Sequence, residues 1–385
     1  MQHIALNYVR SGVDNKKLTA FKKFFTLVFK KSTFYQEKYK KAGITSADKI
    51  QTWEDFVALP LTTRQELANN QMRHPPLGTN LTQPQDSYTY LMYTSGTTTG
   101  QPLFQPLTLR EFDRYSRVLE YGDRLLGISK NDIFCHFTPT YFYPLSLRAI
   151  QRIGARMVPG PQNLEDLLYF LQKMRVTVLQ TYPSVIHQLI EIAQRRRFQV
   201  KNLSLRLLIT TGEPGGGDPK TKKLFERQFN TRVVDHIGST EACITAIQCS
   251  RSEYHLVDKF FIAEVIDPVT KKHATKGELV LTLLWRRDLP FIRYKTGDLV
   301  EIDRTPCFCG NTSPKLRGGV LGRIDGLKKL RALLIYPEEL ERIIRTFSAV
   351  LDYRIILKNE HGLDEVDIFV ELPLTTTHNY LMSLK

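Results

Sequence analysis

The stretch YTSGTTTGQP, residues 93–102, gathers small hydroxyl side chains around two glycines within the length of a turn. Glycine leaves the backbone unobstructed, so N–H groups and hydroxyls in such a turn can surround the oxygens of a phosphate group. An ordinary polar surface turn has the same composition. The stretch is not a Walker P-loop, because no Gly-Lys-Ser/Thr sequence ends it. The candidate phosphate-binding residues are Thr94, Ser95, Gly96, Thr97, Thr98, Thr99 and Gly100.

Four further stretches of small and charged residues follow: TGEP at 211–214, HIGSTEA at 236–242, YKTGDL at 294–299 and LGRIDG at 321–326. The second and third of these stretches present the carboxylates Glu241 and Asp298. Carboxylate oxygens are ligands that suit Mg²⁺. A carboxylate also accepts hydrogen bonds from two hydroxyl groups at once. The alternative for each side chain is a solvated position in a loop, without a ligand.

A second group of residues has the types that bind zinc: Cys249, His255, Cys307 and Cys309. Three thiolates and one imidazole complete the four-coordinate shell of a structural zinc ion. The Cys-x-Cys spacing is tighter than in common zinc motifs, and the alternative is a set of free thiols with a chance histidine. The other two cysteines, Cys135 and Cys243, have no such neighbours and suit packing.

An aromatic segment, residues 135–150, is suited to line a pocket for a flat organic acid. Aromatic rings stack on planar aryl groups. Packing within the core is the alternative for at least two of these rings. The candidate substrate residues are His136, Tyr141, Phe142 and Tyr143.

The composition limits the partners of the chain. Apolar residues make up 42% of the 385 residues, enough for a folded protein with a large core. The net charge is +15, but basic residues are spread along the chain without an aromatic-basic recognition motif, so no nucleic-acid partner is expected. The positive surface favours polyanionic small molecules such as nucleotides.

No membrane partner is expected either. No apolar run is long enough to cross a bilayer. The segment FKKFFTLVFKK, residues 21–31, is interpreted as a basic amphipathic helix that lies on its own domain. An odd number of cysteines and no signal-peptide pattern predict reduced thiols and a cytoplasmic protein. The sequence leaves the oligomeric state open, and a homodimer is one of the allowed states.

The elements that must position these residues alternate between strands and helices. Apolar runs at 176–183, 205–214 and 232–242 end in turn residues, with helical patterns between them. This order predicts an α/β fold in which ligand loops follow the strand ends. A glycine-rich segment at 317–326 predicts a hinge. We therefore expect a large N-terminal domain of mixed sheets covered by helices, residues 1–321, and a small truncated α+β lid domain, residues 322–385. The lid is predicted to hold one helix, YPEELERIIRTF, and two strands.

In this order the five stretches resemble the AMP-forming, adenylate-forming ligase superfamily, and most closely its phenylacetate–CoA ligase-like branch. The resemblance covers most of the chain, from STFYQEKYKKAGI and WEDFVALPLTTRQEL to CFCG and LGRIDG. It implies an ATP-dependent ligase that converts a carboxylic acid, expected to be aromatic, into an acyl-adenylate with release of pyrophosphate. Coenzyme A is one acceptor for the acyl group. The alternatives are an amine, release of the adenylate, or a nucleotide- or acyl-binding protein without turnover.

The resemblance also implies roles for particular residues. Thr94 to Gly100 would hold the β- and γ-phosphates, Glu241 would bind Mg²⁺, and Asp298 would bind both ribose hydroxyls. Arg323 would reach ribose or phosphate, and Asp325 would be the hinge. Similar cysteine and histidine pairs in relatives imply a structural role for the zinc ion. The residues that would line the nucleotide and acyl site are Gly212, Glu213, Pro214, Asp235, His236, Ile237, Gly238, Ser239 and Thr240.

Three departures from the family pattern modify the expectation. The phosphate loop has one threonine more than usual, Gln101 replaces its common basic residue, and Ala332 replaces a glycine after the hinge. Residues 322–385 contain no match to the Gly-Lys segment of relatives, whose lysine contacts the reacting groups. Lys385 is a poor substitute at a terminus. This predicts slow adenylation assisted by Lys328, Lys329 or Arg331, and weak or absent thioester formation.

Overall fold

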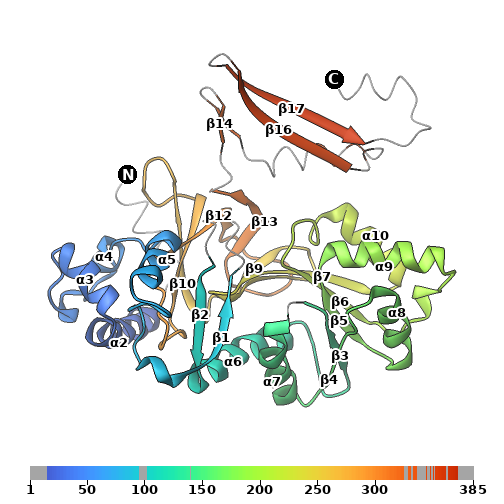
Figure 1. The fold of residues 1–385 in the computed structure, drawn as a ribbon, viewed down its shortest axis with the longest axis horizontal. Helices are drawn as coiled ribbons and strands as arrows, with labels where there is room; N and C mark the ends of the chain where they lie inside the picture. The colour runs from blue at the N-terminus through green and yellow to red at the C-terminus, as the bar shows by residue number, and fades with distance from the viewer. Residues whose placement is uncertain are drawn as a thin grey trace.

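A sheet of eleven strands forms the body of the protein (Figure 1). The computed structural model describes residues 15–94, 102–138, 140–324, 328–330, 333–335, 344, 347, 350, 352–360 and 363–371. The strand order is β10-β11-β12-β13-β9-β8-β7-β6-β5-β3-β4. The sheet is mixed and has helices on its faces, so the predicted α/β class is confirmed.

Four helices near the N-terminus pack at one end of the sheet (Figure 1). The predicted amphipathic helix forms, and its buried face carries Phe21, Phe24, Phe25 and Val28. Thr63 and Glu66 form a capping box that starts the fourth of these helices. Their bounds are Asn15–Lys31 (α2), Thr33–Lys41 (α3), Trp53–Ala58 (α4) and Arg64–Arg73 (α5), with short 3₁₀ turns at Ala47–Lys49 (η1) and Gln85–Ser87 (η2).

The parallel half of the sheet is covered on both faces. One face packs on α6 and α7, and the other packs on α8, α9 and α10. Neighbouring residues in a strand point to opposite faces, so Val234 joins the first cluster and Val233 the second. The strands are Ile133–His136 (β3), Arg156–Pro159 (β4), Val178–Thr181 (β5), Leu207–Thr211 (β6) and Arg232–Ser239 (β7). The helices are Leu109–Leu125 (α6), Tyr143–Ile153 (α7), Leu164–Lys173 (α8), Pro183–Arg195 (α9) and Pro219–Phe229 (α10), with 3₁₀ turns at Thr140–Phe142 (η3) and Val200–Asn202 (η4).

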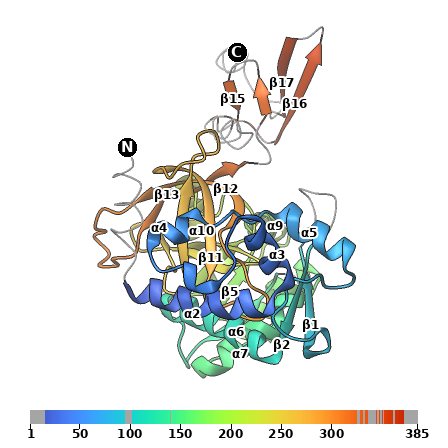
Figure 2. The same cartoon turned by 90° about the vertical axis from the view of Figure 1, so that its left-hand side faces the viewer.

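The rest of the large sheet is antiparallel and carries the later motifs. The register pairs Asp298 with Arg323 across two neighbouring strands. Its strands are Cys243–Gln248 (β8), Tyr254–Leu256 (β9), Phe261–Ile266 (β10), Lys276–Leu283 (β11), Tyr294–Asp303 (β12) and Lys315–Arg323 (β13). A separate antiparallel ribbon consists of Tyr88–Tyr93 (β1) and Phe104–Thr108 (β2), which Figure 2 shows beside α6. The predicted phosphate loop thus connects two paired strands.

Beyond the large sheet, the described strands form two small antiparallel ribbons. They are Lys328–Leu330 (β14) with Leu333–Ile335 (β15), and Asp352–Glu360 (β16) with Leu363–Glu371 (β17). Both views place β16 and β17 apart from the large sheet. The two strands predicted for the lid are confirmed, whereas most of the predicted lid helix lies outside the described residues.

The predicted hinge needs a correction in its first part. Residues 317–323 belong to β13, because they continue its pairing with β12. Gly318 and Gly319 have φ of 72° and 77°, which allows the strand to bend without breaking. The predicted boundary at 321/322 falls inside this strand. Among the described helices, none combines the length and the apolar character needed to cross a bilayer.

Asp123, near the end of α6, gives a pH prediction. Burial raises its pKa to about 7, and Glu120 adds to the shift. The folded-state pKa lies above the usual value, so the free energy of unfolding falls as pH rises from about 5 to about 8. The Asp123→Asn variant has no carboxyl group to titrate at this position. Its free energy of unfolding should therefore fall by about 2 kcal/mol less than that of the wild type between these pH values. Urea unfolding at pH 5 and pH 8 measures this difference.

Asp86→Asn, an exposed site in η2, is the control and should follow the wild type. Equal pH slopes for Asp123→Asn and the wild type would contradict the prediction.

Candidate active site and metal centre

Glu241 lies at the tip of the hairpin that joins β7 to β8. Gly238 pairs with Ile244, and Ser239 pairs with Cys243. A Cβ atom at Gly238 would lie 2.3 Å from the Cys243 carbonyl oxygen, so this close approach requires glycine. The amide of Ala242 donates to Ser239 Oγ at 3.0 Å and closes the turn. The turn leaves the Glu241 side chain only 7% exposed.

The Glu241 carboxylate has two partners from distant parts of the chain. Arg64 Nη1 lies 3.2 Å from its Oε1 atom, and the Tyr294 hydroxyl donates to the same atom at 3.1 Å. The other guanidinium nitrogen, Nη2, donates to Thr94 Oγ1. One arginine therefore connects the predicted magnesium carboxylate to the first residue of the predicted phosphate loop.

Arg64 is a site residue that our sequence analysis missed. It is the first residue of α5 and follows the capping Thr63 in the segment LPLTTRQEL. The capping box fixes the start of the helix and thus the direction in which Arg64 leaves it. The available signal was a basic residue at a helix start, where positive charge is unfavourable unless an anion lies nearby.

Arg286 supports the Glu241 hairpin from the protein interior. Its side chain is fully buried, and Nη1 donates to the carbonyl oxygens of Thr240 and Glu241 at 3.3 and 2.9 Å. Glu111, also buried, lies 3.4 Å from Arg286 Nε and balances its charge. Burial raises the pKa of Glu111, whereas Arg286 lowers it. The backbone of the turn is therefore held by a charged group that solvent does not reach.

The two residues predicted for ribose, Asp298 and Arg323, lie side by side. Arg323 Nη1 donates to Asp298 Oδ1 at 2.6 Å and to the Thr296 carbonyl at 2.9 Å. Gly297 has a φ of 80°, and a Cβ atom there would lie 2.5 Å from Arg323 Nη2. Burial raises the pKa of Asp298, and Arg323 partly offsets this. Glycine next to the carboxylate makes room for the arginine.

The predicted adenine and acyl-site residues Gly212, Glu213 and Pro214 begin the loop at 211–218, which joins β6 to α10 and is anchored on α9. Gly212 has a φ of 77°, and a Cβ atom there would lie 2.8 Å from the Tyr182 ring. Glu213 Oε2 accepts a hydrogen bond at 3.1 Å from the amide of Ser184, in the first turn of α9. A carboxylate at a helix N-terminus is stabilising. Glu213 thus anchors the loop, and Pro214 follows it.

Asp235 lies beneath this loop. It is 7% exposed, and it accepts hydrogen bonds from Thr210 Oγ1 at 2.5 Å and from the Tyr254 hydroxyl at 2.6 Å. Burial raises its pKa to about 6. A carboxylate has about four lone-pair sites, so it can still accept a hydrogen bond from a ligand. The parallel register pairs Thr210 with Asp235 and Thr211 with His236. The two predicted nucleotide stretches therefore meet at the carboxyl ends of neighbouring strands, where ligands of α/β sheets bind.

The predicted substrate residues divide into two pairs. His136 and Tyr143 line a cavity of about 460 Å³ at the carboxyl end of β3, together with Tyr182 and Gly160. Tyr141 and Phe142 instead pack on each other, with ring centroids 4.7 Å apart, and belong to the periphery of the main core. Phe142 therefore packs on the core, with its ring centroid 6.4 Å from that of Tyr115. This was the alternative to a role in the substrate pocket.

His136 brings a neutral imidazole to this cavity. Burial, together with the nearby His236, lowers its pKa to about 4. Its Nε2 atom contacts Thr138 Oγ1, whereas Nδ1 has no hydrogen-bond partner among the residues that the structure describes. Buried polar atoms are rarely left unpaired in native proteins. This Nδ1 atom is itself buried, whereas the residue as a whole lines the cavity.

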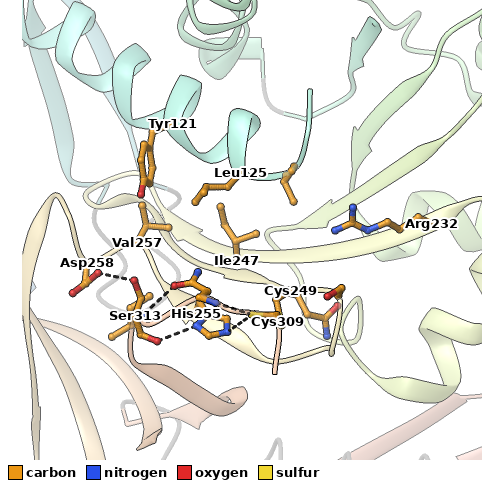
Figure 3. Close-up of a pocket in the computed structure, with 15 residues that line it drawn as sticks. Tyr121, Leu125, Arg232, Ile247, Cys249, His255, Val257, Asp258, Cys309 and Ser313 are labelled. Atoms are coloured by element: carbon orange, nitrogen blue, oxygen red, sulfur yellow. Dashed lines mark hydrogen bonds between the residues drawn. The ribbon is translucent and has the colours of Figure 1, made fainter. Parts of the chain in front are cut away.

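The structure brings the four predicted metal ligands together. Figure 3 shows Cys249, His255 and Cys309 of this group. The ligand atoms of the four residues all lie within 4.8 Å of one another. Cys249 Sγ is 3.9 Å from Cys307 Sγ, and Cys309 Sγ is 3.3 Å from His255 Nε2. Tetrahedral Zn–S bonds of about 2.3 Å would set the sulfur atoms about 3.8 Å apart. The donor set and its spacing therefore fit zinc.

Contacts outside this shell orient the ligands. The His255 Nδ1 atom hydrogen-bonds the Ser313 carbonyl at 2.9 Å, which places the proton on Nδ1 and leaves Nε2 free to bind a metal. Ser313 Oγ in turn donates to Asp258 at 2.9 Å. The backbone amide of Cys309 lowers the pKa of Cys307 to about 7. Such contacts are typical of metal-binding thiolates. Cys135 and Cys243 are buried elsewhere, as predicted for packing residues.

A family model described as AMP-binding enzyme matches residues 26–280, more than half of the chain. The chain belongs to the AMP-binding enzyme family. It is similar to the phenylacetate-coenzyme A ligase of Thermus thermophilus, with 25% identity over 366 residues, 91% of this chain and 79% of that protein. It is also similar to the phenylacetate-coenzyme A ligase of Escherichia coli, with 26% identity, 89% of this chain and 79% of that protein.

The fold agrees with this assignment. A crystal structure of 2-hydroxyisobutyryl-CoA ligase in the postadenylation state superimposes with a TM-score of 0.85. The two chains are 23% identical, and the match covers 95% of this chain and 80% of the other. The predicted superfamily, the phenylacetate–CoA ligase-like branch and the enzyme class, an AMP-forming carboxylate ligase, are confirmed. The roles of individual residues stay predictions.

Several predicted site residues lie outside the residues that the structure describes. They are Ser95, Gly96, Thr97, Thr98, Thr99, Gly100, Asp325 and Arg331. Lys328 and Lys329 form part of β14, but the structure describes only their backbone. Thr94 is therefore the one residue of the predicted phosphate loop that we can place.

Glu241→Gln tests the predicted magnesium carboxylate. The substitution keeps the shape of the side chain and removes the charge, so we expect pyrophosphate exchange to fall by at least about 100-fold. The melting temperature checks that the protein stays folded. Glu191→Gln, an exposed carboxylate on α9, is the matched control and should keep wild-type exchange. Full exchange activity in Glu241→Gln would refute the metal assignment.

The metal centre predicts one tightly bound zinc ion per chain. Its ligands join the β8–β9 segment to the β12–β13 loop, so we expect removal of the ion to lower the melting temperature by about 5 °C or more. Elemental analysis of freshly purified protein and thermal melts before and after chelation measure both effects. Protein that contains no stoichiometric metal and melts unchanged in chelator would argue for free thiols.

Proposed function

We propose that this enzyme uses ATP to convert an aromatic carboxylic acid into acyl-AMP and pyrophosphate, and then transfers the acyl group to coenzyme A. One observation carries the proposal. Arg64 bridges Glu241 and Thr94, although Arg64 and Glu241 are 177 residues apart in the sequence. Three groups therefore meet at one place: a carboxylate, a guanidinium and the first residue of a Ser/Thr/Gly loop. The resemblance to the family assigns this place to the phosphates of the nucleotide.

In the first half-reaction, a substrate carboxylate oxygen attacks the α-phosphorus of ATP, and pyrophosphate leaves with the electron pair of the broken P–O bond. Mg²⁺ bound at Glu241 would offset negative charge on the transferring phosphate. The loop that starts at Thr94 would hold the β- and γ-phosphates with N–H groups and hydroxyls. Asp298 would accept hydrogen bonds from the ribose hydroxyls, with Arg323 beside it.

Arg64 is suited to change partners during this step. Its guanidinium lies 3.2 Å from the Glu241 carboxylate and offsets its charge. A phosphate oxygen competes well for a guanidinium, because the two groups fit each other in geometry and charge. Binding of MgATP would therefore transfer Arg64 to the phosphates and release Glu241 to the metal.

The acyl side of the site favours a flat, uncharged ring. His136 is neutral above a pH of about 4, and Tyr143 and Tyr182 add aromatic walls to the cavity of about 460 Å³. Aromatic side chains stabilise aryl groups by stacking. The similarity to phenylacetate-coenzyme A ligases supports both the aromatic acid and coenzyme A as the acceptor. The reduced thiols of the metal centre favour a cytoplasmic location.

Pyrophosphate exchange and thioester formation, measured side by side, test the proposal. We expect exchange with arylacetic and benzoic acids and little with short aliphatic acids, followed by formation of the CoA thioester. Asp298→Asn should lose exchange with every acid, because the ribose contact is common to all. Exchange with no acid would identify a binding protein, and exchange without thioester would exclude coenzyme A as the acceptor.

A further inference from the structure

Two of the predicted metal ligands have neighbours in the sequence that contact the nucleotide loop. His255 is preceded by Tyr254 in β9, and Cys249 is preceded by Gln248 at the end of β8. Side chains alternate along a strand, so Tyr254 points away from the face on which His255 joins the metal centre. The metal centre and the loop at 211–218 therefore lie on opposite sides of the same short strand.

Tyr254 contacts the nucleotide site in two ways. Its hydroxyl donates to Asp235 Oδ2 at 2.6 Å, and the side chain is almost buried. Its ring also packs against backbone, because a Cβ atom at Gly217 would lie 1.5 Å from the hydroxyl and one at Gly319 would lie 3.1 Å from the ring. Only glycine fits at either position. Tyr254 thus fixes both a predicted adenine-site carboxylate and the backbone of the loop.

Gln248 makes the second connection. It is 1% exposed, and its amide nitrogen donates to the Gly217 carbonyl at 3.5 Å and to the Ser252 carbonyl at 3.2 Å. Its amide oxygen accepts from Lys222 Nζ at 3.0 Å. Lys222 belongs to α10, the helix that follows the loop. The far end of the loop is therefore held by the residue beside Cys249.

The strand between the two sites depends on neighbours for its position. β9 has three residues, and it pairs with β13 only through His255–Lys315 and Tyr254–Leu316. A metal ion bound to Cys249, His255, Cys307 and Cys309 would join β9 to the end of β8 and to the loop before β13. β9 also pairs with β8 through Gln248–Tyr254, Ile247–His255 and Ala246–Leu256, so the ion would add to the strand pairing that fixes Tyr254.

We propose that the metal centre positions the nucleotide loop through β9, with Tyr254 as the residue that transmits this support to Asp235. The proposal rests on the proposed function, because it takes the loop and Asp235 as the site of the nucleotide base. Tyr254 is a positioning residue, since it contacts Asp235 and the loop and not the reacting atoms.

The metal can be reached without unfolding the protein. A cavity of about 460 Å³ is lined by Cys249, His255 and Cys309 (Figure 3). Cys307 and Cys309 flank Phe308, which is 96% exposed. A small chelator therefore has access to the ligands in the folded state, so metal removal and nucleotide binding can be measured on the same folded chain.

The test measures binding of AMP and ATP to the purified metal-loaded protein by calorimetry, with no acid present. We expect chelation to weaken nucleotide binding by about tenfold, and added Zn²⁺ to restore it. Tyr254→Phe keeps the ring and removes the hydroxyl, so it should weaken binding by a similar factor while retaining the metal. Chelation of Tyr254→Phe should then add much less than a further tenfold, because both changes break the same connection. In turnover, the KM for ATP should rise while kcat stays within about twofold.

Tyr121→Phe is the matched control. Tyr121 lines the same cavity, but it packs against Phe260 and Lys259 and not against the loop. It should bind nucleotide as the wild type does. Circular dichroism shows whether the metal-free chain stays folded. If it does not, Tyr254→Phe and Gln248→Ala in the metal-loaded form decide the question.

The outcomes separate this proposal from the proposed function. Unchanged nucleotide affinity in folded metal-free protein, or in metal-loaded Tyr254→Phe, would overturn the proposed coupling alone. Fully additive effects of chelation and Tyr254→Phe would do the same. Failure of the wild-type metal-loaded protein to bind either nucleotide would overturn the proposed function together with the coupling.

Discussion

A buried negative charge at the end of β7 sets the arrangement of this site. Moving a carboxylate out of water is unfavourable unless positive charge and hydrogen-bond donors surround it. Glu241 meets this requirement with Arg64 on one side and the Tyr294 hydroxyl on another. Arg286 supports the backbone beneath it. Each partner comes from a different segment, so the N-terminal helices, the hairpin and β12 must all be in place before the carboxylate is stable.

The two halves of the sheet contribute different chemistry, and the β7–β8 hairpin joins them. The parallel half ends in loops that carry glycine and backbone donors, as in other α/β sheets that bind nucleotides. The antiparallel half contributes side chains in fixed register, such as Asp298 opposite Arg323. Because Glu241 lies at the junction, it can act with groups from both halves.

The predicted metal centre lies at the antiparallel half of the sheet, next to β8, β9 and β13. Its ligands come from the ends of β8, β9 and the loop between β12 and β13, all of which are near strands that form the nucleotide site. Ions that join distant segments contribute to the stability of the fold. Here one of the segments that the ion would join also contacts Asp235 through Tyr254, so the proposed metal support and the proposed nucleotide site share this contact.

The sequence by itself determined the family, the α/β class, the order of the motifs and the four residues predicted to bind a metal, which the structure brings together. Each of these is encoded locally, in the alternation of apolar runs, in turn residues after strands, and in two pairs of ligand types, each pair close together in the chain. The tertiary structure decided which groups meet. Arg64 reached Glu241 and Thr94, Asp235 acquired Tyr254 as a partner, and the predicted hinge at 317–323 became part of β13. These outcomes depend on strand register and on helix placement across more than a hundred residues, which local patterns do not encode because many long-range pairings are compatible with the same periodicity.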